Sequence, residues 1–304
     1  MPLLLRLCAA LLIAALAALP ARAGPNDTAV IIANKAYDHS HEVEFAHNDG
    51  ERFADAARRA LAVPPSRVHV HRDLTGGAMR ALFGRPENPG RIAGLVNRDT
   101  KRLWVYYSGH GFPDRASGKR TPYLLPRDGD PAALEYTGVA LGDVRAALAA
   151  LKKQMAGDAE VILIVEACFS SLSSKGPVQP KVSGSAFHPD LEGDAAVIVI
   201  AAAGDDHVAS WDHQAKLGLF TDVLLDVLFA RAGRTADGKV TLGHLKAHIE
   251  RELQSRLARL YPGETRRQRP WISREAPSIV LTSFSGEPPP RDADETPIAE
   301  TIAV

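Results

Sequence analysis

Two residues of this 304-residue chain could together perform thiol chemistry, because each follows an apolar strand pattern. Cys168 comes shortly after the aliphatic run Val161–Val165, and His110 shortly after the pattern Arg102–Ser108. Such runs predict strands buried in a parallel sheet, and open α/β sheets bind ligands at the carboxyl ends of their strands. If the two strands are neighbours, His110 is placed to take the proton of the Cys168 thiol and make it a nucleophile.

The residues around His110 fit this hypothesis. Gly109 and Gly111 flank it and allow the backbone to turn sharply off the strand end. The N–H groups of Gly111 and Cys168 are candidates for an oxyanion hole, in which losing one donor costs about 10²–10³ in rate. The alternative for Cys168 is a small apolar side chain that fills the core.

The N-terminus bears on the cysteine chemistry. Residues 1–23 predict a signal peptide, because the apolar run Leu7–Leu19 precedes an A-x-A cleavage pattern in Pro20–Ala23. Its removal takes Cys8 away and leaves Cys168 as a lone thiol without an intramolecular disulfide. We therefore predict an exported protein, periplasmic or secreted, with no stable membrane insertion after signal removal. An uncleaved membrane anchor is the alternative.

Composition narrows the class of partner. The chain is 45% hydrophobic and 24% charged, as soluble globular proteins are, and its formal net charge is zero. It has no block of basic residues interleaved with aromatic ones, so nucleic acid is not an expected partner.

Strand and helix patterns alternate along the chain. This order predicts a single α/β domain over residues 24–285, with a mostly parallel central sheet and helices on both faces. Residues 286–304 are rich in proline and acidic residues and predict a disordered tail. The other predicted strands are Thr28–Ala33, Arg67–Leu74, Ala195–Ala203 and Ser278–Thr282. The main predicted helices are Asn48–Ala62, Leu141–Met155, Leu217–Arg231 and Thr241–Leu260, and the predicted loops are Phe112–Gly138, Ser170–Gly193 and Gly204–Lys216.

Two motifs resemble a known family. The segments YYSGHG (Tyr106–Gly111) and VEACFSS (Val165–Ser171) are similar to the signatures of the caspase/metacaspase superfamily of cysteine peptidases. Further matches, in the same order along the chain, are Asn48-Asp49, Tyr123–Pro126 and Gly218–Thr221. The resemblance spans about Thr28 to Thr282. It implies a caspase-haemoglobinase fold and a cysteine endopeptidase acting on proteins or peptides.

The resemblance also implies roles for individual residues. Cys168 would be the nucleophile and His110 the general acid and base, with the N–H groups of Gly111 and Cys168 as the oxyanion hole. No cofactor is implied, and no oligomeric state is predicted.

The position two residues before the cysteine bears on specificity. Caspases that cleave after aspartate have glutamine there, whereas this chain has Glu166. Metacaspases that cleave after Arg or Lys have aspartate there, with a serine and a second aspartate at the positions of Ser108 and Asp49. Two carboxylates favour a guanidinium or ammonium group. We therefore predict substrate binding by Asp49, Ser108 and Glu166 with a basic P1 residue. Asp49 as a helix cap and Glu166 as a buried ion-pair partner are the alternatives.

Two other functions remain open. Legumain-type peptidases also show Glu-Ala-Cys and cleave after asparagine. A non-catalytic caspase-fold protein could instead serve as a binding or scaffold module of the cell envelope.

Metal binding is not predicted. His244 and His248 are four residues apart on a predicted helix, but the HExxH glutamate and a third ligand are lacking. Calcium at the acidic loops Asp128–Asp130 and Asp205–Asp206, as in some metacaspases, is the alternative.

Overall fold

The computed structural model of the protein describes most of the predicted domain. The described residues are 26–114, 121–167, 172–173, 176–177, 196–202, 209–264, 268, 270–273 and 277–291. The predicted signal peptide, Cys168, Asp205 and Asp206 lie outside them, as do most of the loop Ser170–Gly193 and the chain beyond Arg291.

A six-stranded sheet forms the centre of the molecule, in the order β16-β12-β9-β5-β1-β2. All neighbouring pairs are parallel except β12 with β16. Strands buried on both faces need apolar residues at every position, which explains the continuous aliphatic runs of the sequence. The strands are β1 (Thr28–Ala33), β2 (Val68–Arg72), β5 (Arg102–Ser108), β9 (Glu160–Glu166), β12 (Val197–Ala201) and β16 (Trp271–Ile272).

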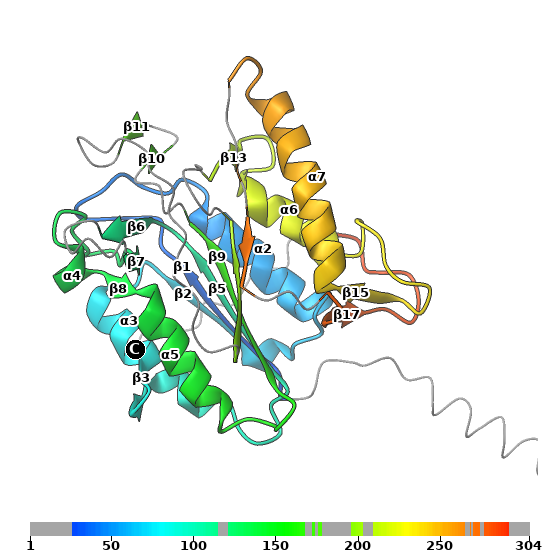
Figure 1. Cartoon of the computed structure of the whole chain (residues 1–304), viewed down its shortest axis with the longest axis horizontal. Coiled ribbons are helices and arrows are strands. Elements are labelled where there is room, and N and C mark those ends of the chain that lie inside the picture. The colour runs from blue at the N-terminus through cyan, green and yellow to red at the C-terminus, as the bar shows by residue number, and fades with distance from the viewer. Residues whose placement is uncertain are drawn as a thin grey trace, which may run out of the picture.

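Helices cover both faces of this sheet, as predicted (Figure 1). Because successive strand residues point to opposite faces, Trp104 and Tyr106 of β5 join one core cluster, and Leu103, Val105 and Tyr107 join the other. The first face carries α2 (Ala46–Arg59), α6 (Leu219–Leu228) and α7 (Leu242–Leu260). The second carries α3 (Gly76–Phe83) and α5 (Leu141–Lys152).

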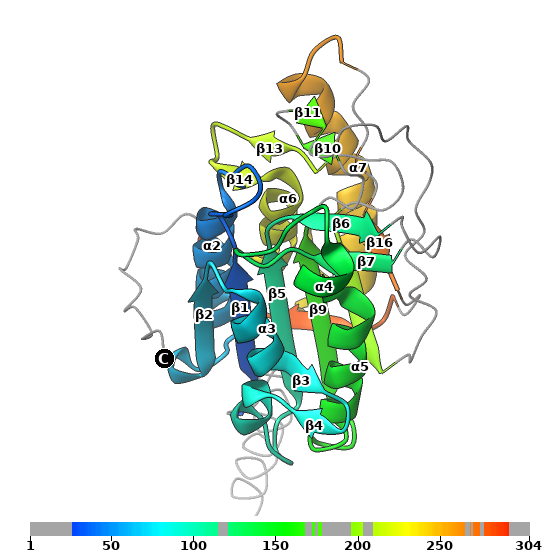
Figure 2. The same ribbon diagram turned by 90° about the vertical axis from the view of Figure 1, so that its left-hand side faces the viewer.

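Short strands gather beyond the carboxyl ends of the parallel strands (Figure 2). The predicted loop Phe112–Gly138 is wrong as a uniform loop, because it contains β6 and β7 of a three-stranded sheet. Runs of two to four residues are too short to show a period in the sequence. These strands are β6 (Gly111–Asp114), β7 (Thr121–Leu124), β8 (Val139–Ala140), β10 (Leu172–Ser173), β11 (Gly176–Pro177), β13 (Trp211–Asp212) and β14 (Leu217–Gly218).

Two helix starts differ from the sequence prediction, and both concern the candidate site. Helix α2 begins at Ala46, so Asp49 lies within its first turn and not at its cap. Helix α6 begins at Leu219, because the preceding Leu217-Gly218 pairs with Trp211-Asp212 as strand β14. The remaining elements are α4 (Leu134–Thr137), the 3-10 turns η1 (Pro65–Arg67) and η2 (Arg91–Leu95), and the strands β3 (Gly84–Arg85), β4 (Asn88–Pro89), β15 (Lys239–Thr241) and β17 (Val280–Ser283).

The C-terminal segment packs against the domain. Strand β17 pairs antiparallel with β15, outside the central sheet. The described chain continues beyond the predicted boundary at residue 285 to Arg291, which is buried, whereas residues 285–287 and Pro290 are exposed. In the described part of the chain, no helix combines the length and apolar character needed to cross a membrane.

Candidate active site

Strands β5 and β9 lie side by side, as the sequence hypothesis requires. Their register pairs Ser108 with Glu166 at the carboxyl end of the sheet. The Gly109 N–H then donates to the Glu166 carbonyl at 3.2 Å, which holds the segment leading to His110 against the end of β9. His110 and Cys168 each follow this pair by two residues in the sequence. Strand β9 ends at Glu166, and Cys168 lies just outside the described residues, which reach Ala167 here.

The imidazole of His110 is held by a backbone carbonyl. Its Nε2 lies 2.7 Å from the carbonyl oxygen of His41. A carbonyl only accepts hydrogen bonds, so the neutral ring must carry its proton on Nε2. This leaves Nδ1 as the atom that can accept a proton. His110 therefore has the tautomer of a base oriented by a third group.

Burial sets the protonation state of His110. The residue is 9% exposed, and its ring lies 4.7 Å from the Tyr37 ring and 5.4 Å from the Phe112 ring, between centroids. This desolvation lowers the pKa of His110 to about 4, although the hydrogen bond to His41 acts in the opposite direction. The imidazole is consequently neutral at neutral pH and available as a base.

The backbone around His110 is fixed by two tyrosines. The His110 N–H donates to the Tyr37 hydroxyl at 2.8 Å, and the Tyr37 hydroxyl donates to the Asn34 carbonyl at 3.0 Å. The Tyr107 hydroxyl donates to the His110 carbonyl at 2.8 Å. Gly109 is required here, because a Cβ at this position would lie 2.5 Å from the Tyr37 hydroxyl oxygen. Gly111 follows directly as the first residue of β6.

A cluster of buried polar residues lies beside this segment, and we call Asp49, Ser108 and Glu166 the acidic cluster. Asp49 of α2 is 1% exposed. Its Oδ2 accepts the Ser108 hydroxyl proton at 2.8 Å, and its Oδ1 accepts the Gly218 N–H at 2.8 Å. Because these contacts are with β5 and β14, Asp49 does not serve as the cap of its own helix.

Glu166, the last residue of β9, lies beside the first turn of α6 and is 5% exposed. Its Oε2 accepts both the backbone N–H and the hydroxyl proton of Thr221 at 2.7 Å. Its Oε1 is buried and has no hydrogen-bond partner among the described residues. Gly218 packs directly on this carboxylate, because a Cβ there would lie 2.7 Å from the carboxyl carbon. The cluster is thus closely packed and still has one unsatisfied oxygen.

The two carboxylates lack a counterion among the described residues. Burial, and then repulsion from Glu166, raises the pKa of Asp49 well above its usual range. Burial raises the pKa of Glu166 to about 7, against the lowering effect of the Thr221 hydrogen bonds. No described Lys, Arg or His forms an ion pair with either carboxylate, so the ion-pair alternative for Glu166 finds no support there. A buried carboxylate without a cation is costly, and a bound cation would relieve that cost.

Several residues of this site carry no signal in the sequence. The His41 carbonyl is a backbone atom of an irregular polar segment, so its residue type predicts nothing. Tyr37 precedes it in the same segment, where a lone tyrosine does not stand out. Thr221 belonged to a segment matched only by resemblance. Thr221 is buried, and its hydroxyl lies 2.6 Å from the Tyr106 hydroxyl. This hydrogen bond connects the acidic cluster to Tyr106.

His244, Asp128 and Asp130, which are candidate metal ligands, form hydrogen bonds within the fold. His244 is part of the capping box that starts α7, and its Nδ1 accepts the Thr241 N–H at 3.1 Å. In the acidic loop, the carboxylate of Asp128 accepts the Gly76 N–H at 2.7 Å, and that of Asp130 accepts the Ala132 N–H at 2.8 Å. Within the described ranges, no three His, Cys, Asp or Glu side chains are grouped to hold a metal ion.

A cavity of about 590 Å³ lies away from these residues, between α3, α5 and β7. Arg80, Tyr123, Tyr136 and Asp143 are among its lining residues. None of the predicted site residues lines it, so this cavity is not part of the candidate active site.

Comparison with known proteins agrees with the fold and with the motifs. The family model described as "Caspase domain" matches residues 26–279. Among solved structures, the chain is similar to the crystal structure of caspase-1 from Spodoptera frugiperda, with a TM-score of 0.56 and 13% sequence identity. This similarity covers 86% of this chain and 92% of that chain. None of the curated proteins matches the chain significantly.

The chain therefore belongs to the caspase-domain family and has the fold of the caspase-type cysteine peptidases. The predicted fold class, with its mostly parallel sheet and helices on both faces, is confirmed. At 13% identity the structural likeness concerns the fold alone.

Proposed function

We propose that this protein is a cysteine endopeptidase that cleaves proteins or peptides after arginine or lysine. The observation that carries the proposal is the acidic cluster, with two buried carboxylates, no described counterion and one unsatisfied oxygen on Glu166. A guanidinium group has five N–H donors and a fixed positive charge, and a lysine ammonium group has three donors. Either would supply what the cluster lacks. An aspartate side chain would be repelled.

The proposed reaction uses Cys168 and His110. Nδ1 of His110 takes the proton of the Cys168 thiol as its sulfur attacks the substrate carbonyl carbon. The N–H groups of Gly111 and Cys168 stabilise the resulting oxyanion. The imidazolium then gives its proton to the leaving amine, and a water molecule deprotonated by His110 hydrolyses the thioester. The His41 carbonyl supports this assignment, because it holds the ring with Nδ1 as the basic atom.

The basic P1 residue would bind with its cationic group against Asp49, Ser108 and Glu166. Compared with an aspartate, the glutamate at position 166 extends its carboxylate by one methylene toward α6, where Thr221 binds Oε2. Oε1 remains for the substrate. We also retain the proposal that the protein is exported, based on the predicted signal peptide of residues 1–23.

The test is a panel of fluorogenic peptides that differ only at P1, with Arg, Lys, Asp or Asn, measured with and without calcium. We expect cleavage after Arg and Lys only. Cleavage only after Asp would contradict the role of the acidic cluster, and cleavage only after Asn would favour the legumain-like alternative. No cleavage, together with a Cys168 thiol that iodoacetamide does not modify at neutral pH, would favour the scaffold alternative.

Two variants test the dyad. Cys168→Ala removes the nucleophile and should abolish turnover, whereas His110→Ala should lower kcat by about 10²–10⁴-fold. His69→Ala, on the edge strand β2, is the matched control and should retain full activity. Substantial activity in the Cys168 or His110 variant would refute the assignment of that residue.

A further inference from the structure

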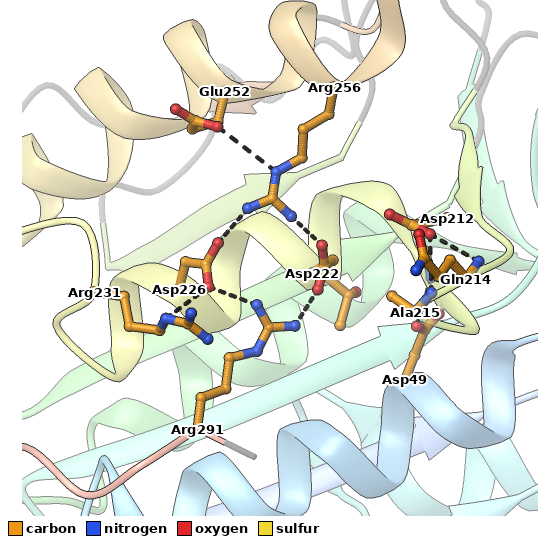
Figure 3. A network of polar contacts seen from close by, with 12 residues as sticks. Asp49, Asp212, Gln214, Ala215, Asp222, Asp226, Arg231, Glu252, Arg256 and Arg291 are labelled. Carbon is orange, nitrogen blue, oxygen red and sulfur yellow. Dashed lines mark hydrogen bonds and ion pairs between the residues drawn. The ribbon is translucent and has the colours of Figure 1, made fainter. Parts of the chain in front are cut away.

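A second group of buried charges lies around α6. Its two aspartates follow Thr221, which binds Glu166, on the same helix. We call Asp222, Asp226, Arg256 and Arg291 the ion-pair cluster (Figure 3). Both arginines contact both carboxylates. The pair between Arg291 Nη1 and Asp226 Oδ1 spans 2.6 Å. Each carboxylate is thus held from two sides, by Arg256 of α7 and by Arg291 of the C-terminal segment.

The positive and negative charges of the ion-pair cluster are equal in number. Asp222 and Asp226 are 4% and 7% exposed, and Arg291 is 8% exposed. Two further charges lie at its edge, with Glu252 of α7 at 3.7 Å from Arg256 and Arg231 at 3.8 Å from Asp226. Two carboxylates and two guanidinium groups cancel in the interior, so Asp222 and Asp226 of α6 are neutralised within the cluster.

The ion-pair cluster is coupled to the acidic cluster through the same helix. Gly218 and Thr221, at the start of α6, donate to Asp49 and Glu166. Asp222 is the next residue, and its charge is one of the causes that raise the pKa of Asp49. The other groups around Asp49 and Glu166 are the neutral hydroxyls of Tyr106, Ser108 and Thr221. Among the described residues, Asp222 is therefore the one charge besides Glu166 that raises the pKa of Asp49.

Arg291 comes from a segment outside the family match, which ends at residue 279. The neighbouring Pro290 carbonyl accepts a hydrogen bond from Arg59, in the last turn of α2. The same short segment therefore contacts α2, which carries Asp49, and α6, which binds both carboxylates. Figure 3 shows Arg291 and Arg256 contacting Asp222 and Asp226 of α6 from opposite sides.

We propose that Arg291 is a positioning residue for the acidic cluster. Its ion pairs neutralise Asp222 and Asp226 and hold the start of α6, so the C-terminal segment 284–291 sets how strongly Asp49 and Glu166 bind a cationic substrate group. The proposal rests on the proposed function, because it assigns the acidic cluster to a basic P1 side chain.

The test is the pH dependence of kcat/KM on an Arg-P1 peptide. In the wild type we expect an acid limb near pH 7, because the carboxylates must be ionised to bind the cation. Arg291→Met leaves excess negative charge beside Asp49, which favours the protonated carboxyl groups. The limb should move up by about half a pH unit to one unit. KM should rise several-fold at pH 6.5 and return toward the wild-type value at pH 9, while kcat changes little.

Three variants distinguish this effect from a purely structural one. Arg291→Lys keeps the charge and should restore the limb, and so should Arg291→Met combined with Asp222→Asn. Asp222→Asn alone should move the limb down, which keeps the test available if Arg291→Met does not fold. Arg234→Met is the control, because Arg234 contacts the Gly286 carbonyl of the same segment at an exposed position. It should leave the limb in place.

Binding of benzamidine, a cationic amidine, to the Cys168→Ala protein gives a readout without turnover. Arg291→Met should weaken this binding at pH 6.5 and leave it nearly unchanged at pH 9. If the acid limb and the benzamidine affinity are unchanged in folded Arg291 and Asp222 variants, the inference about Arg291 is overturned. The proposed function would not be affected by that result. Absence of cleavage after Arg in the wild type would instead overturn the proposed function.

Discussion

Two pairs of carboxylates lie buried around the start of α6, and they differ in what neutralises them. Asp222 and Asp226 each contact two arginines. In the part of the chain that the structure describes, Asp49 and Glu166 accept hydrogen bonds only from neutral donors, and Oε1 of Glu166 accepts none. The first pair is complete within the protein. The second lacks a cation among the described residues, and this difference supports the proposal that it binds a cationic group of the substrate.

The cost of burial explains why the difference is informative. A buried charge lowers stability unless a partner compensates for its lost hydration. The ion-pair cluster meets this requirement and therefore holds α6, α7 and the C-terminal segment together. The acidic cluster does not, and its carboxylates respond with raised pKa values. The comparison thus predicts opposite effects on stability when the two clusters are altered.

The largest expected effect is the loss of a cation from the ion-pair cluster. Arg256→Met leaves the two buried carboxylates with Arg291 and with Arg231 at the edge of the cluster, 3.8 Å from Asp226. Breaking buried ion pairs costs about 3–5 kcal/mol. Chemical denaturation at pH 7 measures the free energy of unfolding. Arg251→Met, at an exposed position of the same helix, is the matched control and should change it by less than about 0.5 kcal/mol. An equally small change for Arg256→Met would remove the contrast between the two clusters.

The next effect has the opposite sign and depends on pH. Glu166→Gln removes one of two repelling buried charges and should stabilise the protein by about 1–3 kcal/mol at pH 8. The pKa of Glu166 is raised to about 7 in the folded protein, from an ordinary 4.5. Below pH 4.5 the Glu166 carboxyl group is protonated in both the folded and the unfolded protein, and its burial costs no stability. As the pH rises through 7 the buried group ionises, and the wild-type protein loses this contribution to its stability. The gain of the variant should vanish at about pH 4.5.

His110 contributes to the same pH profile in the other direction. Its pKa is lowered to about 4, so its contribution is present above pH 6.5 and lost as the pH falls through 4. Because wild type and Glu166→Gln share this contribution, their difference cancels it. If Glu166→Gln is less stable than the wild type at pH 8, the Glu166 carboxylate must be satisfied by hydrogen bonds or a cation in the folded state.

The smallest expected effect concerns a buried polar group without charge. Tyr37→Phe removes the hydroxyl between the His110 N–H and the Asn34 carbonyl but keeps the ring against the imidazole. Each of these two neutral hydrogen bonds contributes about 1 kcal/mol, so their summed loss is at most about 2 kcal/mol. We expect that loss of stability and a kcat reduced about five- to tenfold with little change in KM. A change in KM alone would indicate that Tyr37 contacts the substrate instead of positioning His110.

Much of the fold follows from local patterns in the sequence. The strand Thr28–Ala33 and the strand Arg102–Ser108 have the predicted bounds, because continuous aliphatic runs are nearly unambiguous in a parallel sheet. The short strands β6 to β8 were missed, since a few residues interrupted by proline and glycine show no period. The start of α6 was placed too early, because the pairing of Leu217 with Asp212 is a contact between separate segments.

The candidate site divides in the same way. His110 and Glu166 could be chosen from the sequence, because reactive residue types directly follow or end apolar strands. The His41 carbonyl could not, because any residue supplies the same backbone atom and the contact depends on how a loop folds. Arg291 was assigned to a tail on composition, yet its partners Asp222 and Asp226 are more than sixty residues away.

By itself, the sequence determined the order of strands and helices, the residue types at the ends of β5 and β9, and the membership in the caspase-domain family. Only the tertiary structure decided which carboxylates have a counterion. Four aspartates and glutamates, at positions 49, 166, 222 and 226, are chemically similar in the sequence. Their charges differ in effect because electrostatic energy depends on distance and burial, and both are set by segments that meet only when the chain folds.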